Sequence, residues 1–289
     1  MAGISTNRSN IALPTEVSAD IIQKTQEESA VMALARQIAL PGRGLTIPVI
    51  TGDPEAAWVD ETDPKPVSNP ALSQKIMQAY KLAVIVPFSN EFARDAEALY
   101  DALVARLPLA LAQKFDATVF HGTAPGSNFD TFASVTAQSI GATGATLYAA
   151  LVAADTDIAT NGGLLNGFAF SAQGRGALLG AVDGQDRPLF INNASEGAIP
   201  TLLGAPVKYS KAAYKAGTSP NPNVIGFAGD WSQAVYGTVE GVKIDLSNQA
   251  SLTVSGNQIN LWERNMFAVR AEIEVGFRAD TSVFNKITG

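Results

Sequence analysis

Apolar and polar residues alternate most regularly between residues 269 and 277. Every second position there is apolar, and the positions between them include Arg270, Glu272 and Glu274. A period of two places the apolar side chains on one face of a strand and the charged ones on the other. The pattern predicts a half-buried antiparallel strand with one charged face.

A helical period dominates residues 89–121. Ser89 is a favourable N-cap, acidic residues follow it, and Gly122 is a favourable stop signal. The apolar positions recur every three or four residues, at Phe92, Ala96, Leu99, Tyr100, Leu103, Val104, Leu107, Leu111, Phe115 and Val119. Pro108 interrupts this pattern, so we expect one long helix with a kink or a locally broken hydrogen-bond ladder at that point.

Between residues 31 and 86 the pattern predicts extended chain. A strand at 45–50 follows a Pro-Gly turn, and a return strand runs over 75–86, with Ile76 and Tyr80 on one face and Met77 on the other. The polar segment between the strands contains Trp58 and concentrates six charges within residues 53–65. A long two-stranded hairpin is marginal in water. We therefore expect it to lie on a neighbouring surface.

An α/β pattern occupies residues 145–246. Helices are expected at 145–160 and 172–181, with Ser171 as the cap of the second. Strands are expected at 167–170, 202–209 with a bend at Gly204, 224–227 and 241–246.

Residues 1–28 are polar and contain one short helical pattern. They have too few apolar residues to fold alone, so we interpret them as an arm that becomes ordered on another surface. No apolar stretch approaches the ~18 residues of a membrane span, and the N-terminus has no apolar core of a secretory signal. We expect no membrane partner and an intracellular protein.

The composition narrows the function further. Charged residues make up 16% of the 289 residues, and the net charge is −7. This low charged fraction favours a subunit that buries its surface against partners, and the negative charge argues against a dedicated nucleic-acid binder. The absence of cysteine and the single histidine exclude thiolate catalysis, thiolate metal sites and any site with two histidines.

The remaining candidates for chemistry have simpler interpretations. His121 is at the predicted end of the long helix, and Ser171 lacks the glycine spacing of a nucleophile elbow. Asp155 and Asp157 are two residues apart on a helix, so they face different directions. The sequence therefore predicts no catalytic residues, no metal, no cofactor and no enzyme.

Several stretches resemble the major capsid proteins of tailed bacteriophages, which have the Hong Kong 97 fold. These stretches are 13–22, 47–49 followed by 57–61, 81–89, 120–123, 201–207, 229–236 and 267–277. The resemblance implies an α+β fold with an N-terminal arm at 1–28 and an extended loop at 36–87. It also implies a peripheral domain with a long spine helix at 89–138 and 246–289, and an axial α/β domain at 139–245.

By this resemblance the protein forms hexamers and pentamers of an icosahedral shell that encloses double-stranded DNA. Expected partners are other copies of itself, a portal protein, separate scaffolding and decoration proteins, and the packaged DNA without sequence preference. The expected location is the virion capsid, and the host cytoplasm during assembly. An encapsulin-type bacterial nanocompartment is the alternative within the same fold, and a soluble α/β enzyme is a third possibility.

Five residues are candidates for contacts between subunits. Trp58, Glu61 and Lys65 lie near the tip of the expected loop, and Arg270 and Arg278 lie on the charged face of the strand near the C-terminus. An aromatic anchor supplies interface energy, whereas charges at a rim mainly set orientation.

Overall fold

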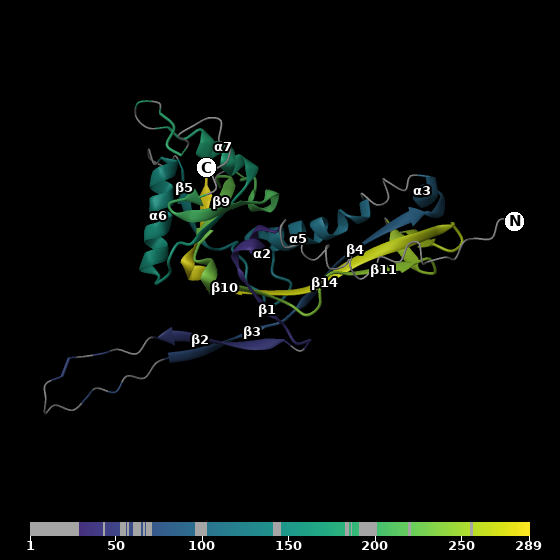
Figure 1. The fold of residues 1–289 in the computed structure, drawn as a ribbon, viewed down its shortest axis with the longest axis horizontal. Helices are drawn as coiled ribbons and strands as arrows, with labels where there is room; N and C mark the ends of the chain where they lie inside the picture. Colours follow the sequence, from purple (N-terminus) through teal and green to yellow (C-terminus); the bar gives the residue numbers. More distant parts are fainter. Residues whose placement is uncertain are drawn as a thin grey trace.

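The structure is a computed structural model that describes the chain in several stretches. These are residues 29–42, 44–52, 56, 58–59, 65, 67, 71–95, 103–140, 146–182, 185, 187–190, 201–218, 221–254 and 257–289. The predicted arm and Glu61 lie outside them. The described part combines helices and strands, which confirms the α+β class. Figure 1 shows a compact lobe, an elongated lobe and a long hairpin that projects from them.

A six-stranded mixed sheet forms the centre of the compact lobe (Figure 1). In order across the sheet, its strands are β5 (Thr136–Ser139), β15 (Phe284–Thr288), β9 (Val224–Gly229), β6 (Gly167–Phe170), β8 (Ala205–Tyr209) and β7 (Thr201–Leu202). Helix α6 (Leu147–Thr160) packs on β5, β15 and β9, and α7 (Ala172–Leu179) packs on β6 and β9. The hydroxyls of Thr146 and Ser171 cap these helices, so the cap predicted at Ser171 is confirmed.

The elongated lobe is organised around β14 (Met266–Ala279). Strand β4 (Tyr80–Ser89) pairs antiparallel along one edge of β14, and β11 (Lys243–Ser247) and β10 (Ala234–Thr238) pair with its other edge. Strand β1 (Arg36–Ala39) is parallel to β10. The apolar residues of β14 after Met266 are buried, and the charged residues between them are more exposed. The prediction of a half-buried antiparallel strand with one charged face is confirmed.

One apolar core joins the two lobes. Phe115 of α5 (Leu107–His121) meets Phe277 of β14 edge to face, with ring centroids 6.3 Å apart. Phe132, which follows α5, contacts Phe277 at 5.6 Å and stacks on Phe284 of β15 at 4.3 Å. Because Phe277 belongs to the elongated lobe and Phe284 to the compact lobe, Phe132 packs at the junction of both sheets.

The projecting hairpin consists of β2 (Leu45–Gly52) and β3 (Ala71–Met77), which pair antiparallel. Among the described residues, neither strand pairs with any other strand. The hairpin extends away from both lobes in Figure 1. Its separation from the main core agrees with the expectation that this segment has no core of its own.

The predicted long helix is interrupted. Helix α3 (Asn90–Asp95) follows β4, residues 103–104 are also helical, and a turn at 105–106 separates them from α5, which begins at Leu107. Pro108 therefore lies in the first turn of α5, where its missing N–H costs no helical hydrogen bond. The broken ladder is confirmed, and the break precedes the proline. Gly122 ends α5 as predicted, and its N–H donates to the carbonyl of Thr118.

The predicted return strand is two strands. Strand β3 ends at Met77, and β4 begins at Tyr80 after an interruption at residues 78–79. The interruption reverses the faces, because Met77 is fully buried while Ile76 is half exposed. The common face predicted for Ile76 and Tyr80 is therefore wrong. The physical reason is that the two halves pair with different partners, β3 with β2 and β4 with β14.

Two further predictions need correction. Residues 201–209 form a hairpin, not one bent strand, because Leu203 and Gly204 both have positive φ (49° and 81°) in a two-residue turn. Residues 30–34, where the extended segment was predicted to begin, form helix α2 (Ala30–Leu34). Its N-cap is Ser29, whose side chain accepts the N–H of Met32.

Candidate functional site

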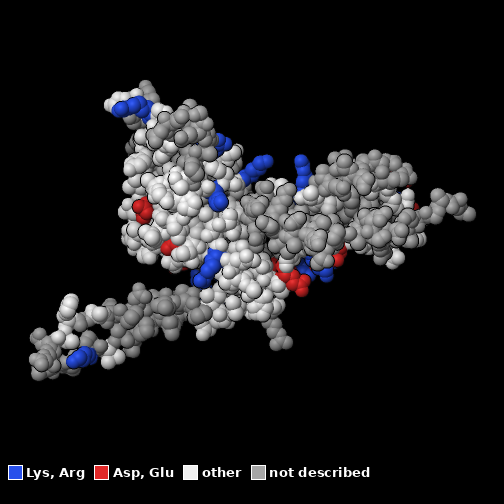
Figure 2. All heavy atoms as spheres, in the orientation of Figure 1, with Lys and Arg blue, Asp and Glu red and all other residues white. Residues whose placement is uncertain are grey.

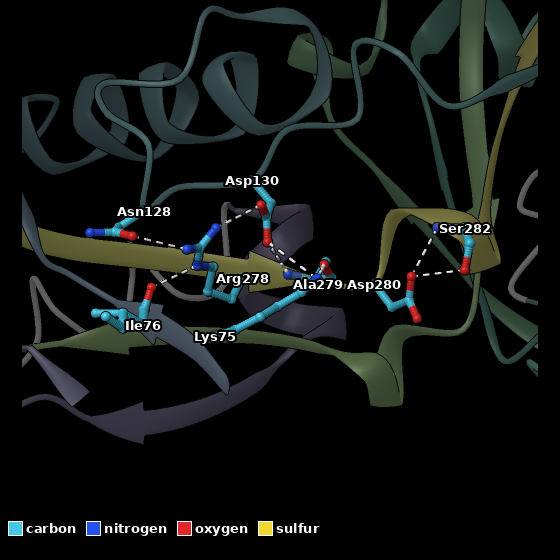
Figure 3. Close-up of polar contacts among 8 residues, drawn as sticks. All are labelled: Lys75, Ile76, Asn128, Asp130, Arg278, Ala279, Asp280 and Ser282. Atoms are coloured by element: carbon cyan, nitrogen blue, oxygen red, sulfur yellow. Dashed lines mark hydrogen bonds and ion pairs between the residues drawn. The ribbon is translucent and has the colours of Figure 1, made fainter. Parts of the chain in front are cut away.

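The root of the projecting hairpin is held by Arg278 of β14 (Figure 3). Its Nε donates to the carbonyl of Ile76 at 2.8 Å, and its two terminal nitrogens donate to Asp130 at 2.8 Å and to Asn128 at 3.1 Å. The same arginine therefore binds the hairpin and the loop that follows α5. Only 13% of its side chain is exposed, and such a largely desolvated multiple contact fixes geometry more firmly than a surface pair does.

Asp130 is the shared acceptor at this root. Besides Arg278, its carboxylate accepts the N–H of Ala279 at 3.1 Å and lies 3.9 Å from Nζ of Lys75. Lys75, on β3, also donates to the carbonyl of Ala279 at 2.8 Å. Two cations thus converge on one carboxylate, and one of them comes from the hairpin itself (Figure 3).

Apolar packing supports the same root. Met77 is fully buried in a small cluster with Leu40 and Val235, separate from the main core. Gly44, at the start of the hairpin, has a φ of 86°, and a Cβ there would lie 2.7 Å from the carbonyl oxygen of Met77. A residue with a side chain at this position would have a strained backbone, and its Cβ would clash with the backbone of Met77. The hairpin therefore leaves the body from a fixed base.

The hairpin tip carries exposed apolar residues. Trp58 is fully exposed, and Val67 has 87% of its surface exposed. Lys65 is exposed as well. An exposed tryptophan on a projecting hairpin is a strong candidate for an interface anchor.

The five predicted contact residues are thus in different settings. Trp58 and Lys65 are exposed, Glu61 lies outside the described residues, and Arg278 is engaged within its own chain. Arg270 is 44% exposed and donates to Asp245 at 2.6 Å. Among the described residues, the hydrogen bonds and ion pairs of Arg270 and Arg278 are to residues outside the hairpin tip, and none is to Trp58 or Lys65.

Arg270 belongs to a charged strip on the sheet face that points away from α5. Lys81 lies 3.2 Å from Glu274, and Arg270 lies 3.5 Å from Glu272, besides its bond to Asp245. In Figure 2, red and blue atoms lie together beneath the elongated lobe, where this strip is found. Exposed pairs of this kind contribute little to stability, so the strip is suited to orienting a partner.

A buried carboxylate joins three other segments. Asp116 of α5 accepts from the hydroxyl of Ser29 at 2.5 Å, from the N–H of Ala30 at 2.9 Å and from the hydroxyl of Ser210 at 3.0 Å. Ser29 and Ala30 begin α2, and Ser210 follows β8. Burial raises the pKa of Asp116 to about 6, although these hydrogen bonds oppose the rise.

We expect Asp116→Asn to change how stability depends on pH. Because the pKa of Asp116 in the folded chain, about 6, lies above the ordinary value of 3.8 for an aspartate, this group stabilises the fold below pH 4 and loses that contribution as the pH rises through 6. The difference corresponds to about 3 kcal/mol. Unfolding of subunits between pH 4 and 7.5 should therefore show the variant gaining stability relative to the unmodified chain as the pH rises. A constant difference across this range would contradict the assignment.

His121 has a structural position at the end of α5. Its Nε2 lies 3.1 Å from the carbonyl oxygen of Ala213, and its ring packs 5.2 Å from that of Phe227. Burial lowers the pKa of this histidine. The interpretation as a helix-end residue agrees with these contacts.

We expect His121→Gln to leave particle formation unchanged. Glutamine retains a donor that can reach the carbonyl of Ala213, and no described acid or nucleophile is hydrogen-bonded to the imidazole. Sedimentation of assembled particles is the measurement. Loss of particles with an unchanged unfolding temperature would show that His121 has a role beyond packing.

The described residues contain no cluster of three or more His, Cys, Asp or Glu side chains able to hold a metal ion. Asp157 instead accepts a hydrogen bond from Asn285 at 2.9 Å. None of the described helices is both long and apolar enough to span a membrane. What the geometry offers is a projecting hairpin with a fixed root and an exposed aromatic tip.

Comparison with known sequences identifies the family. A profile of the Phage capsid family matches residues 10–282. The chain belongs to the phage capsid family. The probable major capsid protein of Mycobacterium phage L5 is 30% identical over 298 residues, which cover 96% of this chain and 89% of the relative. The major capsid protein of Staphylococcus phage 80alpha is 25% identical, over 95% of this chain and 84% of that protein.

Solved structures agree with this assignment at the level of the fold. A chain from Mycobacterium phage Ogopogo matches with a TM-score of 0.76 and 19% identity, covering 91% of this capsid protein and 92% of that chain. The family consists of structural capsid proteins, so the prediction that the chain is not an enzyme is confirmed. The matches also support the phage capsid over the encapsulin alternative.

Most residues that hold the hairpin of this capsid protein were not predicted from the sequence. Asp130, Asn128 and the buried Asp116 were not singled out, and Met77 was named only for its face of the predicted strand. An acid among the apolar positions of a helix is a signal that could have identified Asp116, because a buried carboxylate needs several donors. No local pattern indicates Asp130, because its partner Arg278 is 148 positions away.

Proposed function

We propose that this chain is the major head subunit of a tailed phage and forms hexamers and pentamers of an icosahedral shell around double-stranded DNA. Membership of the phage capsid family supports the shell. The observation that carries the proposal is the projecting hairpin with its fixed root and the fully exposed Trp58. A two-stranded hairpin of this length is stabilised only when it lies on another surface.

The proposed architecture has four parts. Residues 1–28 are the arm, 36–87 the extended loop, 89–138 with 246–289 the peripheral domain, and 139–245 the axial domain. The lobe built around β14 and α5 supports the peripheral domain, with α5 as the main part of the spine helix. The six-stranded sheet supports the axial domain, and two of its strands, β5 and β15, come from the ends of the two peripheral segments.

In the assembled shell, the loop of one subunit lies over its neighbour. Trp58 anchors it by burying its ring, while Glu61 and Lys65 orient the loop through charge pairs at the rim. The strip that contains Arg270 is the proposed receiving surface, because it presents exposed charges of both signs. Arg278 is better suited to holding the root of the hairpin than to binding the loop of a neighbouring subunit, because it already makes three hydrogen bonds within its own chain.

The proposed partners beyond the subunit itself are a portal protein, separate scaffolding and decoration proteins, and the packaged DNA. The net charge of −7 favours a shell that holds DNA without binding it tightly. The proposed locations are the virion and, during assembly, the host cytoplasm.

Electron microscopy and sedimentation of particles from cells that express the chain test this proposal. We expect closed shells, and shells that contain DNA when the other phage proteins are present. Small uniform shells that contain protein cargo would favour the nanocompartment alternative. Compact monomers or dimers at high protein concentration would contradict the shell function altogether.

A further inference from the structure

The outer surface of α6 is unusually poor in charge for an exposed helix. Its exposed residues include Tyr148, Ala149, Val152, Ala153, Asp155 and Thr156, of which only Asp155 is charged. Tyr148 is 48% exposed and Val152 is 40% exposed. Figure 2 shows a mostly white surface over α6. We call these six residues the α6 stripe; such a surface is typical of a protein contact.

A second exposed surface lies on the other half of the same sheet. Leu203 is 44% exposed at the β7–β8 turn, and Tyr209 is 39% exposed at the end of β8. Lys208 is exposed between them, and Arg175 of α7 is close enough to Tyr209 for its charge to oppose the effect of burial on the pKa of the phenol. We call these four residues the β8 flank. It combines apolar side chains with two cations.

We propose that the α6 stripe of one subunit docks on the β8 flank of a second copy of this chain. Each surface has large exposed apolar side chains, and the single carboxylate of the stripe, Asp155, complements Lys208 and Arg175 of the flank. This inference rests on the proposed shell function and specifies one contact within a capsomer.

The sheet order makes the contact head to tail. Helix α6 packs on β5, β15 and β9, whereas β8 and β7 are at the opposite edge of the sheet. The two surfaces are therefore different patches on different sides of the compact lobe. A contact between unlike patches repeats from copy to copy and closes into a ring when the rotation allows. The compact lobes would thus surround the axis of the ring, and Tyr148 and Tyr209 would be the main anchors.

Disulfide trapping tests the proposal directly, because the chain contains no cysteine. Two pairs of substitutions are used: Val152→Cys with Leu203→Cys, and Thr156→Cys with Lys208→Cys. Assembled particles are oxidised with copper phenanthroline and separated without reductant. We expect at least one pair to give covalent multimers up to the size of the ring. The control pair, Val152→Cys with Lys114→Cys, places the second thiol at an exposed position of α5 and should give none.

The outcomes separate this inference from the proposed function. If shells form but neither pair gives multimers, the contact is wrong while the shell function stands. Multimers of equal yield from the control pair would reflect random collision and would also overturn the contact. If no variant and no unmodified chain assembles, the shell function fails and the contact fails with it.

A second measurement covers cysteine variants that do not assemble. Val152→Glu places an unpaired carboxylate in the contact and should lower the yield of capsomers by about tenfold or more, since 1.4 kcal/mol corresponds to a factor of ten. Val152→Thr keeps the shape of the side chain and should assemble well. Both variants should unfold at the temperature of the unmodified subunit. Normal assembly of Val152→Glu would overturn the proposal.

Discussion

Replacing Arg278 with alanine is expected to release the root of the projecting hairpin. The change removes donors to Ile76, Asn128 and Asp130, and within the described part of the chain it leaves the Asp130 carboxylate with only the backbone N–H of Ala279 and the more distant Lys75. Breaking one partner of a largely buried ion pair costs about 3 kcal/mol. We expect a lower unfolding temperature of unassembled subunits and faster proteolysis within residues 45–77.

Arg270→Ala is the matched control, because Arg270 is on the same strand but is 44% exposed. Its removal should cost less than about 1 kcal/mol of subunit stability. Arg278→Lys keeps the charge but cannot make the three directed contacts, so it should resemble the alanine variant in proteolysis. Equal stability losses for Arg270→Ala and Arg278→Ala would show that the root does not depend on this network.

Trp58→Ala is expected to weaken the assembled shell far more than the subunit. The side chain is fully exposed in the single chain, so removing it costs the isolated subunit almost nothing. If it anchors the loop on a neighbour, its removal should cost about 2 kcal/mol or more for each contact. Because every copy in the shell repeats that contact, we expect poor particle yield or shells that dissociate at lower temperature.

Two comparisons make the Trp58 result specific. Val67→Ala removes a smaller exposed side chain near the same tip and should have a smaller effect. Glu61→Gln should matter less than Trp58→Ala, and its effect should shrink as salt is added. A lower melting temperature of isolated Trp58→Ala subunits, together with normal shells, would place Trp58 in its own hairpin and contradict the intersubunit role.

The parts of the fold that the sequence predicted are those with a strong local pattern. Alternation over 269–277 identified β14, and the capping serine at 171 identified α7. The strands that were not predicted, β5, β10, β12 (Ser251–Val254), β13 (Asn257–Asn260) and β15, are five residues or fewer. Short strands have too few positions to show a period, and their pairing is decided by distant partners.

The break between β3 and β4 could not be predicted either, because it also depends on pairing with distant strands. The sequence of residues 75–86 does not mark a boundary, and only the change of pairing partner reverses the faces at 78–79. Only part of the candidate site could be predicted from the sequence. An exposed Trp58 on a hairpin follows from local composition, whereas the roles of Arg278 and Asp116 depend on partners 148 and 87 positions away.

The placement of β14 and β15 has a consequence for synthesis on the ribosome. Strand β14 lies between β4 and the β10–β11 edge, and β15 lies between β5 and β9. Both are interior strands, and both are translated after every strand that they pair with. Neither sheet is therefore complete until residues 266–288 have emerged, because a chain that stops early lacks the strand that joins β4 to β10 and β11 and the strand that joins β5 to β9. A truncated chain therefore lacks the folded surfaces that contact neighbouring subunits. We expect such a chain to stay out of the growing shell without any additional factor that removes it.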